Sequence, residues 1–421
     1  MTFRCAAALA ALVCSTVISA QTLLITGKRP SRMMESVGPT VTPLSIGTAD
    51  GHAIWGSTGQ DAQGHIWIGI TTGGEVPSAH LIDFDPASDK QVDRGNVVEQ
   101  LERAGVARKG EHQSKIHSKI VPGPDGFLYF ASMDEEGENP NGSRLPTWGG
   151  HLWRMNQTTY KWEHLLATRE ALIAVAGGGK YIFSLGYFGH VLYRYDTTNG
   201  STAKVEVGSV GGHISRNFVA DYRGHVFVPR LRGVAAAPDQ QSTRASIVEF
   251  DGNLREVKET PIDYDKYTDS NPTDTHGIIA VQEMNDRSWY FTTHVGFLYH
   301  VVPPTPASDG LDESPATVVP VSWFHPNGKT YVPSLFTTDG INTLLGLSRD
   351  DQGRYQWLTF DVTALRCLVA PFGLSGDPEA FSRDLLYGSA TRDAAGRHYV
   401  VGMAGYQPIV LRVEPRKRTK G

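Results

Sequence analysis

The chain has 421 residues, of which 20% are charged, and it carries a formal net charge of −5. Its basic residues form no stripe, so a nucleic acid is not an expected partner. The 45 glycines and the 10% of aromatic residues favour a turn-rich all-β protein over a helical one.

Residues 1–20 have the pattern of a secretory signal peptide. Arg4 precedes an apolar run that ends in small residues before Gln21. This run is short for a membrane-spanning helix, and no later segment is apolar enough to span a bilayer. We therefore expect a secreted protein, extracellular or periplasmic, that begins at Gln21 and has no membrane partner.

Removal of this segment would leave Cys367 as the only cysteine of the mature chain. An intramolecular disulfide and a cysteine-cluster metal site are then excluded. Cys367 stands in the apolar segment LRCLVA, so we expect it to be a small buried residue and not a reactive thiol.

One pattern recurs along the chain: an apolar strand, a turn with Asp and Gly, and a strand rich in β-branched and aromatic residues. Its clearest copies read TGQDAQGHIWIGI, VPGPDGFLYFAS, VADYRGHVFVPR, LSRDDQGRYQWLTF and ATRDAAGRHYVVGM. A third strand follows most copies and a fourth follows several, with a period of about 40–65 residues. This period predicts an all-β fold, a β-propeller of about seven four-stranded blades.

We place the blade starts near residues 54, 116, 170, 214, 275, 330 and 383, within a single propeller domain over residues 21–415. Ser36–Gly47 is expected to close the ring by pairing with the last blade, and residues 416–421 form a basic tail. A monomer is expected. The alternative, two separate β-sandwiches, lacks this period and would need a linker that the sequence does not contain.

Polar residues recur at one phase of the repeat. In a propeller, the turns between first and second strands lie on one face, and the connections into first strands and between second and third strands lie on the other. The second face then collects residues of about four consecutive blades: His117, His151, Tyr187, His213, Arg216, Arg230, His276 and His294. Each residue alone is more often structural than functional, and the shared phase is what predicts one site.

Histidine, tyrosine and arginine with few acidic neighbours suit the removal of a proton α to a carboxylate. Arginine and histidine stabilise the developing charge, histidine or tyrosine acts as the base, and tyrosine returns a proton to the leaving oxygen. This is β-elimination on a uronic acid. A glycosidase would need a pair of carboxylates across the bond, whereas the plausible acids here, Asp134–Glu136, share one loop, and no GxSxG motif is present.

Three segments, GEHQSKIHSKIV, GYFGHVLYRYD and GGHISRNFVADYRGHVFVPR, resemble secreted seven-bladed propeller polysaccharide lyases, the ulvan lyases and the related rhamnose–glucuronate lyases. The resemblance implies a uronate-containing polysaccharide as the partner. It implies His117 as the base or its partner, Tyr187 as the catalytic tyrosine, and Arg216 or Arg230 as the carboxylate clamp.

By the same resemblance His213 assists catalysis, while His151, His276 and His294 bind substrate. Several such enzymes carry a divalent ion, so a calcium or zinc ion held by converging histidines is an open alternative.

Two other functions fit a propeller. One is a non-catalytic domain that binds a glycan or a protein on aromatic platforms such as Trp148, Trp153, Tyr187 and Phe188. The other is a different propeller enzyme such as a lactonase, which would need an acidic metal cage that the sequence does not indicate.

Overall fold

The computed structural model describes residues 28–415 except 36, 140–142, 188–189, 210–214, 235–241, 263–276, 306–312, 351, 388 and 390, and it leaves out the side chains of 233–234 and 242–244. The expected signal peptide, the basic tail, Phe188, His213 and His276 lie outside the described residues.

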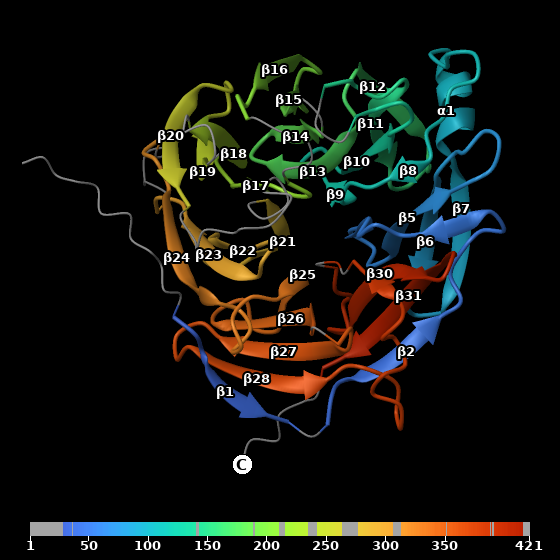
Figure 1. Ribbon diagram of the computed structural model, residues 1–421. Coiled ribbons are helices and arrows are strands. Elements are labelled where there is room, and N and C mark those ends of the chain that lie inside the picture. Colours follow the sequence, from blue (N-terminus) through green and yellow to red (C-terminus); the bar gives the residue numbers. More distant parts are fainter. Residues whose placement is uncertain are drawn as a thin grey trace, which may run out of the picture.

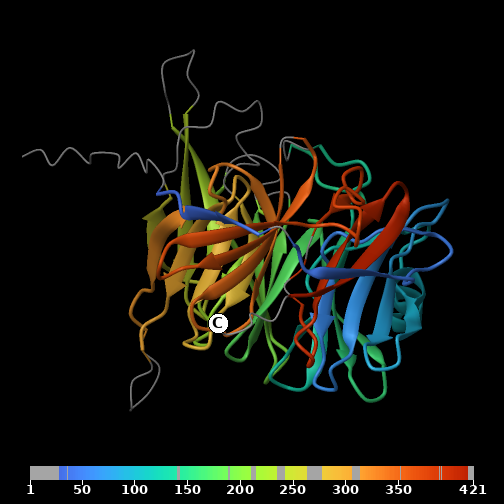
Figure 2. The ribbon, with the colours of Figure 1, turned by 90° about the horizontal axis from the view of Figure 1, so that it is seen from below.

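Seven β-sheets stand as blades around a central axis (Figure 1), which confirms the prediction of an all-β seven-bladed propeller. Figure 2 shows the same ring from the side. Blade 1 consists of β3 (Gly51–Ala53), β4 (Thr58–Gln60), β5 (Ile66–Thr72), β6 (His80–Asp85) and β7 (Lys90–Asn96). Blade 2 consists of β8 (Lys115–Ile116), β9 (Val121–Pro122), β10 (Phe127–Asp134), β11 (Gly149–Asn156) and β12 (Trp162–Thr168). Blade 3 consists of β13 (Leu172–Gly178), β14 (Tyr181–Gly186), β15 (Val191–Asp196) and β16 (Thr202–Glu206).

Each later blade also has its strands in antiparallel order. Blade 4 consists of β17 (Val219–Ala220), β18 (Val226–Val234), β19 (Ser242–Phe250) and β20 (Glu256–Pro261), and blade 5 of β21 (Ile278–Glu283), β22 (Trp289–Thr293), β23 (Phe297–Val302) and β24 (Thr317–Trp323). Blade 6 consists of β25 (Tyr331–Thr337), β26 (Thr343–Arg349), β27 (Tyr355–Asp361) and β28 (Arg366–Pro371). Blade 7 consists of β29 (Leu385–Leu386), β30 (His398–Ala404) and β31 (Gln407–Glu414).

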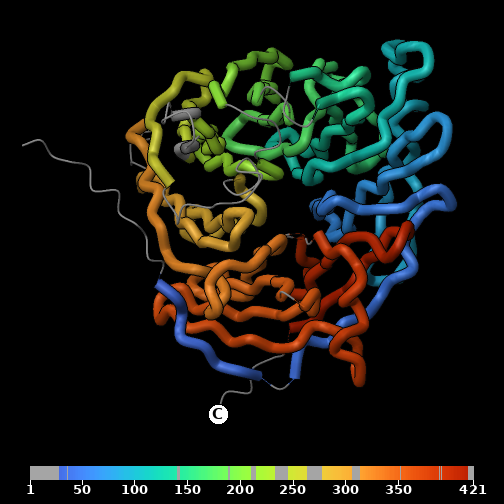
Figure 3. Tube along the Cα trace, in the orientation of Figure 1, coloured from blue at the N-terminus to red at the C-terminus, as the bar shows by residue number. Residues whose placement is uncertain are grey.

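Two N-terminal strands complete the ring. Strand β2 (Thr40–Leu44) pairs antiparallel with β31 and forms the outer edge of the last blade, as predicted. Strand β1 (Ser31–Met34), which the repeat does not predict, adds to β28 in parallel as a fifth strand of blade 6. Figure 3 shows both blue segments lying along the red and orange blades.

The Asp–Gly turns have a local hydrogen-bonding cause. In blade 1, Asp61 Oδ1 accepts the backbone N–H groups of Gln63 and His65 at 3.0 and 2.8 Å, and Gly64 adopts a positive φ of 89°. The other carboxylate oxygen of Asp61 accepts the indole N–H of Trp67 at 2.8 Å. An aromatic residue shortly after the turn therefore locks the hairpin, as Tyr129 does on Asp125 and Tyr399 on Asp393.

One copy of the pattern is out of phase with the others. The turn Asp350–Gly353 joins β26 to β27, the second and third strands of blade 6, whereas the first turn of that blade is 337–340. Asp–Gly turn chemistry does not depend on which pair of strands it connects, so the sequence pattern alone misassigned this turn.

The core is divided among the blade interfaces. Seven clusters of buried apolar residues fill the spaces between adjacent blades, one cluster at each interface. Cys367 lies in β28 within the cluster between blades 5 and 6, and burial raises the pKa of its thiol to about 12. It is thus an inert core residue, as expected.

The chain between blades 1 and 2 forms helix α1 (Val97–Ala104). The Asn96 side chain accepts the backbone N–H of Glu99 at its start, and Gly105 ends it with a left-handed backbone. Within the described part of the chain, no helix has the length and hydrophobicity that crossing a bilayer would require.

Candidate functional site

A pocket opens at the propeller axis, where the innermost segments of six blades meet. Its lining residues are Trp55, Gly56, His117, Lys119, Arg216, Asn217, Ile279, Ala280, Tyr331, Pro333, Leu335, Tyr387 and Ser389. Its cavity volume is about 30 Å³. We call this narrow space the axial pocket.

The described lining of the axial pocket contains two cations, Lys119 and Arg216, and no carboxylate. Lys119 is half-buried, and desolvation lowers its pKa to about 8. The absence of a lining carboxylate gives the pocket a positive potential.

His117 is 8% exposed and is held neutral. Burial, and then the positive charges of Arg216 and Lys115, lower its pKa well below the ordinary value of 6.5. Its Nδ1 atom is buried and has no hydrogen-bond partner among the described residues. A neutral imidazole in this setting can accept a proton from a bound molecule.

Aromatic rings flank His117. The indole of Trp55 is nearly parallel to the imidazole, with ring centroids 6.3 Å apart, and the ring of Tyr387 lies 4.5 Å from Trp55. The indole Nε1 of Trp55 is a second buried nitrogen without a described partner. Because a buried polar atom left unpaired costs stability, these two nitrogens indicate a ligand or ordered water in the axial pocket.

Tyr387 also faces a cation. The guanidinium carbon of Arg216 lies 5.8 Å from the centroid of the Tyr387 ring. Burial raises the pKa of Tyr387 to about 12, against the opposing effect of Arg216, so the phenol keeps its proton at neutral pH. The Tyr387 phenol is therefore available as a proton donor.

Of the eight residues predicted from sequence, the structure brings His117 and Arg216 together in the axial pocket. His294 lies beside it, with its ring centroid 5.1 Å from that of the pocket residue Tyr331. Tyr187 is 5% exposed, belongs to the core cluster between blades 3 and 4, and does not line the pocket.

Arg230 and His151 are engaged elsewhere. The Arg230 guanidinium forms ion pairs with Glu256 and Glu259 at 2.8 and 2.9 Å. His151 is buried, with its Nε2 3.0 Å from Glu111 and its Nδ1 2.9 Å from His164. Neither residue lines the axial pocket.

The sequence analysis missed Trp55, Lys119, Tyr331 and Tyr387 as pocket residues. A register signal identifies three of them. Each of these three, like His117, stands nine residues before the positive-φ glycine of the first turn in its blade: Trp55 before Gly64, His117 before Gly126, Tyr331 before Gly340 and Tyr387 before Gly396. In blades 1, 2, 6 and 7 this spacing identifies a pocket residue, whereas Glu170 and Ser215, which hold the same position in blades 3 and 4, do not line the pocket.

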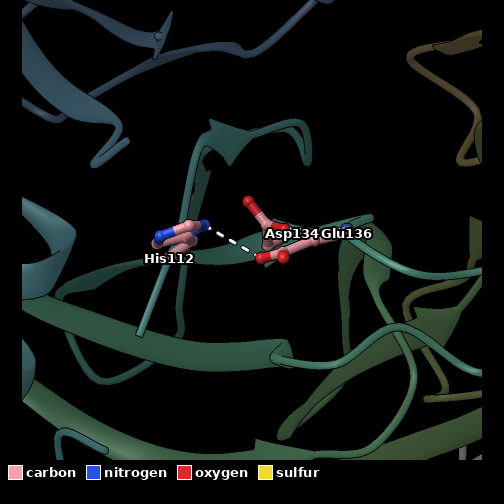
Figure 4. Close-up of side chains that lie close together, drawn as sticks. All are labelled: His112, Asp134 and Glu136. Carbon is pink, nitrogen blue, oxygen red and sulfur yellow. Dashed lines mark hydrogen bonds and ion pairs between the residues drawn. The ribbon is translucent and has the colours of Figure 1, made fainter. Parts of the chain in front are cut away.

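A possible metal site lies at the end of β10, outside the axial pocket. His112, Asp134 and Glu136 each offer one ligand atom, and these atoms lie within 4.8 Å of one another (Figure 4). One imidazole with two carboxylates suits zinc, and the spacing also suits calcium. In the structure Glu136 instead pairs with His112 Nδ1 at 3.0 Å and accepts the indole N–H of Trp148 at 2.7 Å, so an ion would replace the first of these contacts.

The aromatic platforms proposed for a binding propeller are mostly unavailable. Trp153 is buried and donates its indole N–H to Ser132 at 3.1 Å. Trp148 is partly exposed and packs against the ring of His112 and the guanidinium of Arg108. Trp55 and Tyr387 are the aromatic pair at the axial pocket.

No protein-family model and no curated protein matches this chain. Solved structures that match do so at low identity. The extracellular domain of a putative hybrid two-component system from B. thetaiotaomicron is 14% identical with a TM-score of 0.53, over 89% of this chain, which spans 39% of that one. A chain of the mitotic checkpoint complex is 8% identical with a TM-score of 0.51, over 99% of this chain and 98% of that one.

The structure of U3-55K is 10% identical with a TM-score of 0.50, over 90% of this chain and 100% of that one. At these identities the similarities show the propeller fold alone.

Proposed function

We propose that this protein is a polysaccharide lyase that cleaves a uronate-containing glycan by β-elimination. The observation that carries the proposal is the axial pocket, which places a neutral buried histidine, an arginine and a protonated tyrosine together without a lining carboxylate. This composition suits an anionic substrate and disfavours glycoside hydrolysis, which needs two carboxylates.

In the proposed reaction Arg216 pairs with the uronate carboxylate. His117 takes the proton at C5, the electron pair forms the C4–C5 double bond, and the C4–O bond breaks with its electrons on the leaving oxygen. A tyrosine donates its proton to that oxygen. Arg216 contributes because negative charge builds on the carboxylate as the proton leaves.

The position of Arg216 in the axial pocket supports Arg216 over Arg230 as the clamp. The charge of Arg230 is already matched by Glu256 and Glu259, whereas Arg216 faces the space beside His117. A carboxylate bound there would also raise the low pKa of His117 and make it a stronger base.

Two tyrosines compete for the role of proton donor: Tyr187 through the resemblance and Tyr387 through its position in the pocket. Replacing each with Phe decides between them, because loss of the donor lowers turnover by a factor on the order of 10² or more while the ring remains. If a Tyr→Phe variant keeps near-wild-type turnover, the replaced tyrosine is not the proton donor.

The test is a rise in ultraviolet absorbance when the protein is mixed with a panel of uronate polysaccharides, including ulvan, since the unsaturated uronate product absorbs there. His117→Ala should abolish the rise in a folded protein. A flat signal with every polymer overturns the lyase proposal.

The second candidate is a propeller that binds an anionic glycan without cleaving it. The observation that favours it is the pair of aromatic faces, Trp55 and Tyr387, beside the pocket cations. Binding of a uronate polymer without any absorbance change would establish it.

We also propose that the protein is secreted as a monomer with a uronate polysaccharide as its partner. Sequencing the N-terminus of the exported protein tests the first part, and a start at Gln21 is the expected result.

A further inference from the structure

Lys119 is the one lysine of the axial pocket, and its charge is unmatched. No hydrogen bond, ion pair or ring contact joins it to another described residue. Lys115, in the same segment, pairs with Glu135, and Lys180 lies 2.9 Å from Asp196. Lys119 faces the axial pocket without such a carboxylate.

The groups that surround Lys119 in the pocket are cationic or neutral. They are His117 from its own segment, Arg216 from blade 4, Tyr331 from blade 6 and Tyr387 from blade 7. Since His117 is neutral and Tyr387 keeps its proton, these groups supply no negative charge to a protonated Lys119.

A second observation points to a ligand in the same space. His117 Nδ1 and Trp55 Nε1 are buried nitrogens with no described hydrogen-bond partner, and both residues line the axial pocket. Two cations and two unpaired nitrogens around one cavity form a site for a small group with oxygen atoms and negative charge.

We infer that Lys119 is a second anchor for the carboxylate of the ligand, acting with Arg216. This inference rests on the proposed function for the identity of the ligand as a uronate. It assigns Lys119 to specificity for the acid group and not to the bond-breaking step.

This anchor role predicts that Lys119 takes up a proton when a carboxylate binds, because binding and protonation are thermodynamically linked. In the free protein the pKa of Lys119 is lowered to about 8, so at pH 9 most molecules carry a neutral amine. A bound carboxylate favours the ammonium form and raises the pKa again. Binding at pH 9 should therefore take up close to one proton per site, and binding at pH 7, where Lys119 is already charged, should take up little.

The experiment is calorimetric titration of the full-length mature protein with sodium glucuronate at pH 7 and pH 9, in two buffers of different ionisation enthalpy. The difference between buffers gives the number of protons taken up. Glucose serves as the uncharged control. The wild type should show uptake at pH 9 and should bind glucuronate in preference to glucose.

Three variants sharpen the test. Lys119→Arg should bind glucuronate without proton uptake at pH 9, because the guanidinium stays charged. Lys119→Gln should weaken binding about tenfold or more at pH 7. Lys180→Gln, the matched control away from the pocket, should behave as wild type, and thermal unfolding verifies that each variant is folded.

Equal uptake in wild type and Lys119→Arg overturns the inference, as does wild-type affinity in Lys119→Gln or the absence of glucuronate binding by the wild type. The outcome is separable from that of the lyase proposal. Proton-linked binding without an unsaturated product leaves Lys119 as an anchor and removes the lyase. An unsaturated product with unchanged binding by Lys119→Gln supports the lyase and removes Lys119 as an anchor.

Discussion

The propeller buries cations in two different settings. In blade 4, Arg223 lies 2.7 Å from Asp221 and 3.1 Å from Glu249, and His225 Nδ1 lies 2.7 Å from Glu249. At the axis, Lys119, Arg216 and His117 share a pocket whose described lining has no acid. We call the first set the blade 4 network.

This contrast distinguishes charges that carboxylates pair within a blade from charges that line a pocket. The blade 4 network is complete without a ligand, because each buried cation has a carboxylate partner. The described lining of the axial pocket holds no carboxylate beside its two cations. Arg216 and Arg223 stand seven residues apart in one segment, so residue type and sequence neighbourhood do not distinguish the two settings.

The largest expected effect is on stability in the blade 4 network. Arg223→Ala removes the guanidinium from the buried carboxylate of Asp221 and leaves Glu249 with His225 as its remaining cationic partner, which should cost about 3–5 kcal/mol of unfolding free energy. Urea unfolding measures it. Arg216→Ala is the matched control and should change stability by no more than about 0.5 kcal/mol. Equal losses of unfolding free energy in Arg223→Ala and Arg216→Ala would contradict the distinction between the blade 4 network and the axial pocket.

The next effect is on turnover at the axial pocket. Arg216→Ala should lower kcat/KM by a factor of about 10², or ~2.7 kcal/mol of transition-state stabilisation, because the clamp acts on charge that develops in the reaction. Absorbance of the unsaturated product measures it. Arg230→Ala, whose guanidinium is paired with Glu256 and Glu259, should lose stability and keep its turnover per folded molecule. The reverse pattern would make Arg230 the clamp.

The pH dependence of stability should have opposite signs in the two settings. Burial lowers the pKa of His117, so its contribution is intact above the unfolded value near 6.5 and is lost as pH falls below it. Burial alone would also lower the pKa of His225, but its hydrogen bonds with Glu249 and Glu313 outweigh burial and raise it. Its contribution is therefore full below about pH 6.5 and is lost as pH rises through the folded pKa.

Urea unfolding between pH 5 and 8 measures this difference. Relative to wild type, His117→Gln should gain stability toward acid pH and His225→Gln should lose it, each by at most about 1.4 kcal/mol per pH unit. Parallel pH profiles for wild type and both variants would contradict the assignment.

The smallest effect is expected at Cys367, a buried residue outside both settings. Cys367→Ala should cost ~1 kcal/mol of stability, through lost packing in the core between blades 5 and 6. Product formation should be unchanged. Loss of turnover in a folded variant would mean that the thiol takes part in the chemistry.

The fold was predictable because the signals that specify it are local. An Asp carboxylate that binds the backbone N–H groups two and four residues later defines a hairpin within a few residues, and its repetition defines the propeller. The repeat did not predict the pairing of β1 with β28, because blade 6 already has its four strands and β1 adds a fifth to them in parallel.

The site was predictable only in part. His117 and Arg216 stand at the correct phase and have a recognisable chemistry, so the sequence points to both. Arg230 has the same chemistry, but Glu256 and Glu259 reach it from β20, the outer strand of the same blade, and sequence phase does not reveal this neutralisation. Tyr387 stands nine residues before a turn glycine, as His117 does, and the sequence analysis did not use this spacing.

The closing strand β2 has a consequence for how the molecule can fail. Its residues are among the first of the described chain, yet they cover the edge of β31, among the last, through a register from Thr40 with Glu414 to Leu44 with Val410. A protease cut after β2, or its deletion, would bare the backbone of β31 along that register. Bare strand edges join to one another, so such a chain should aggregate edge to edge through its last blade while the other six blades keep their shape.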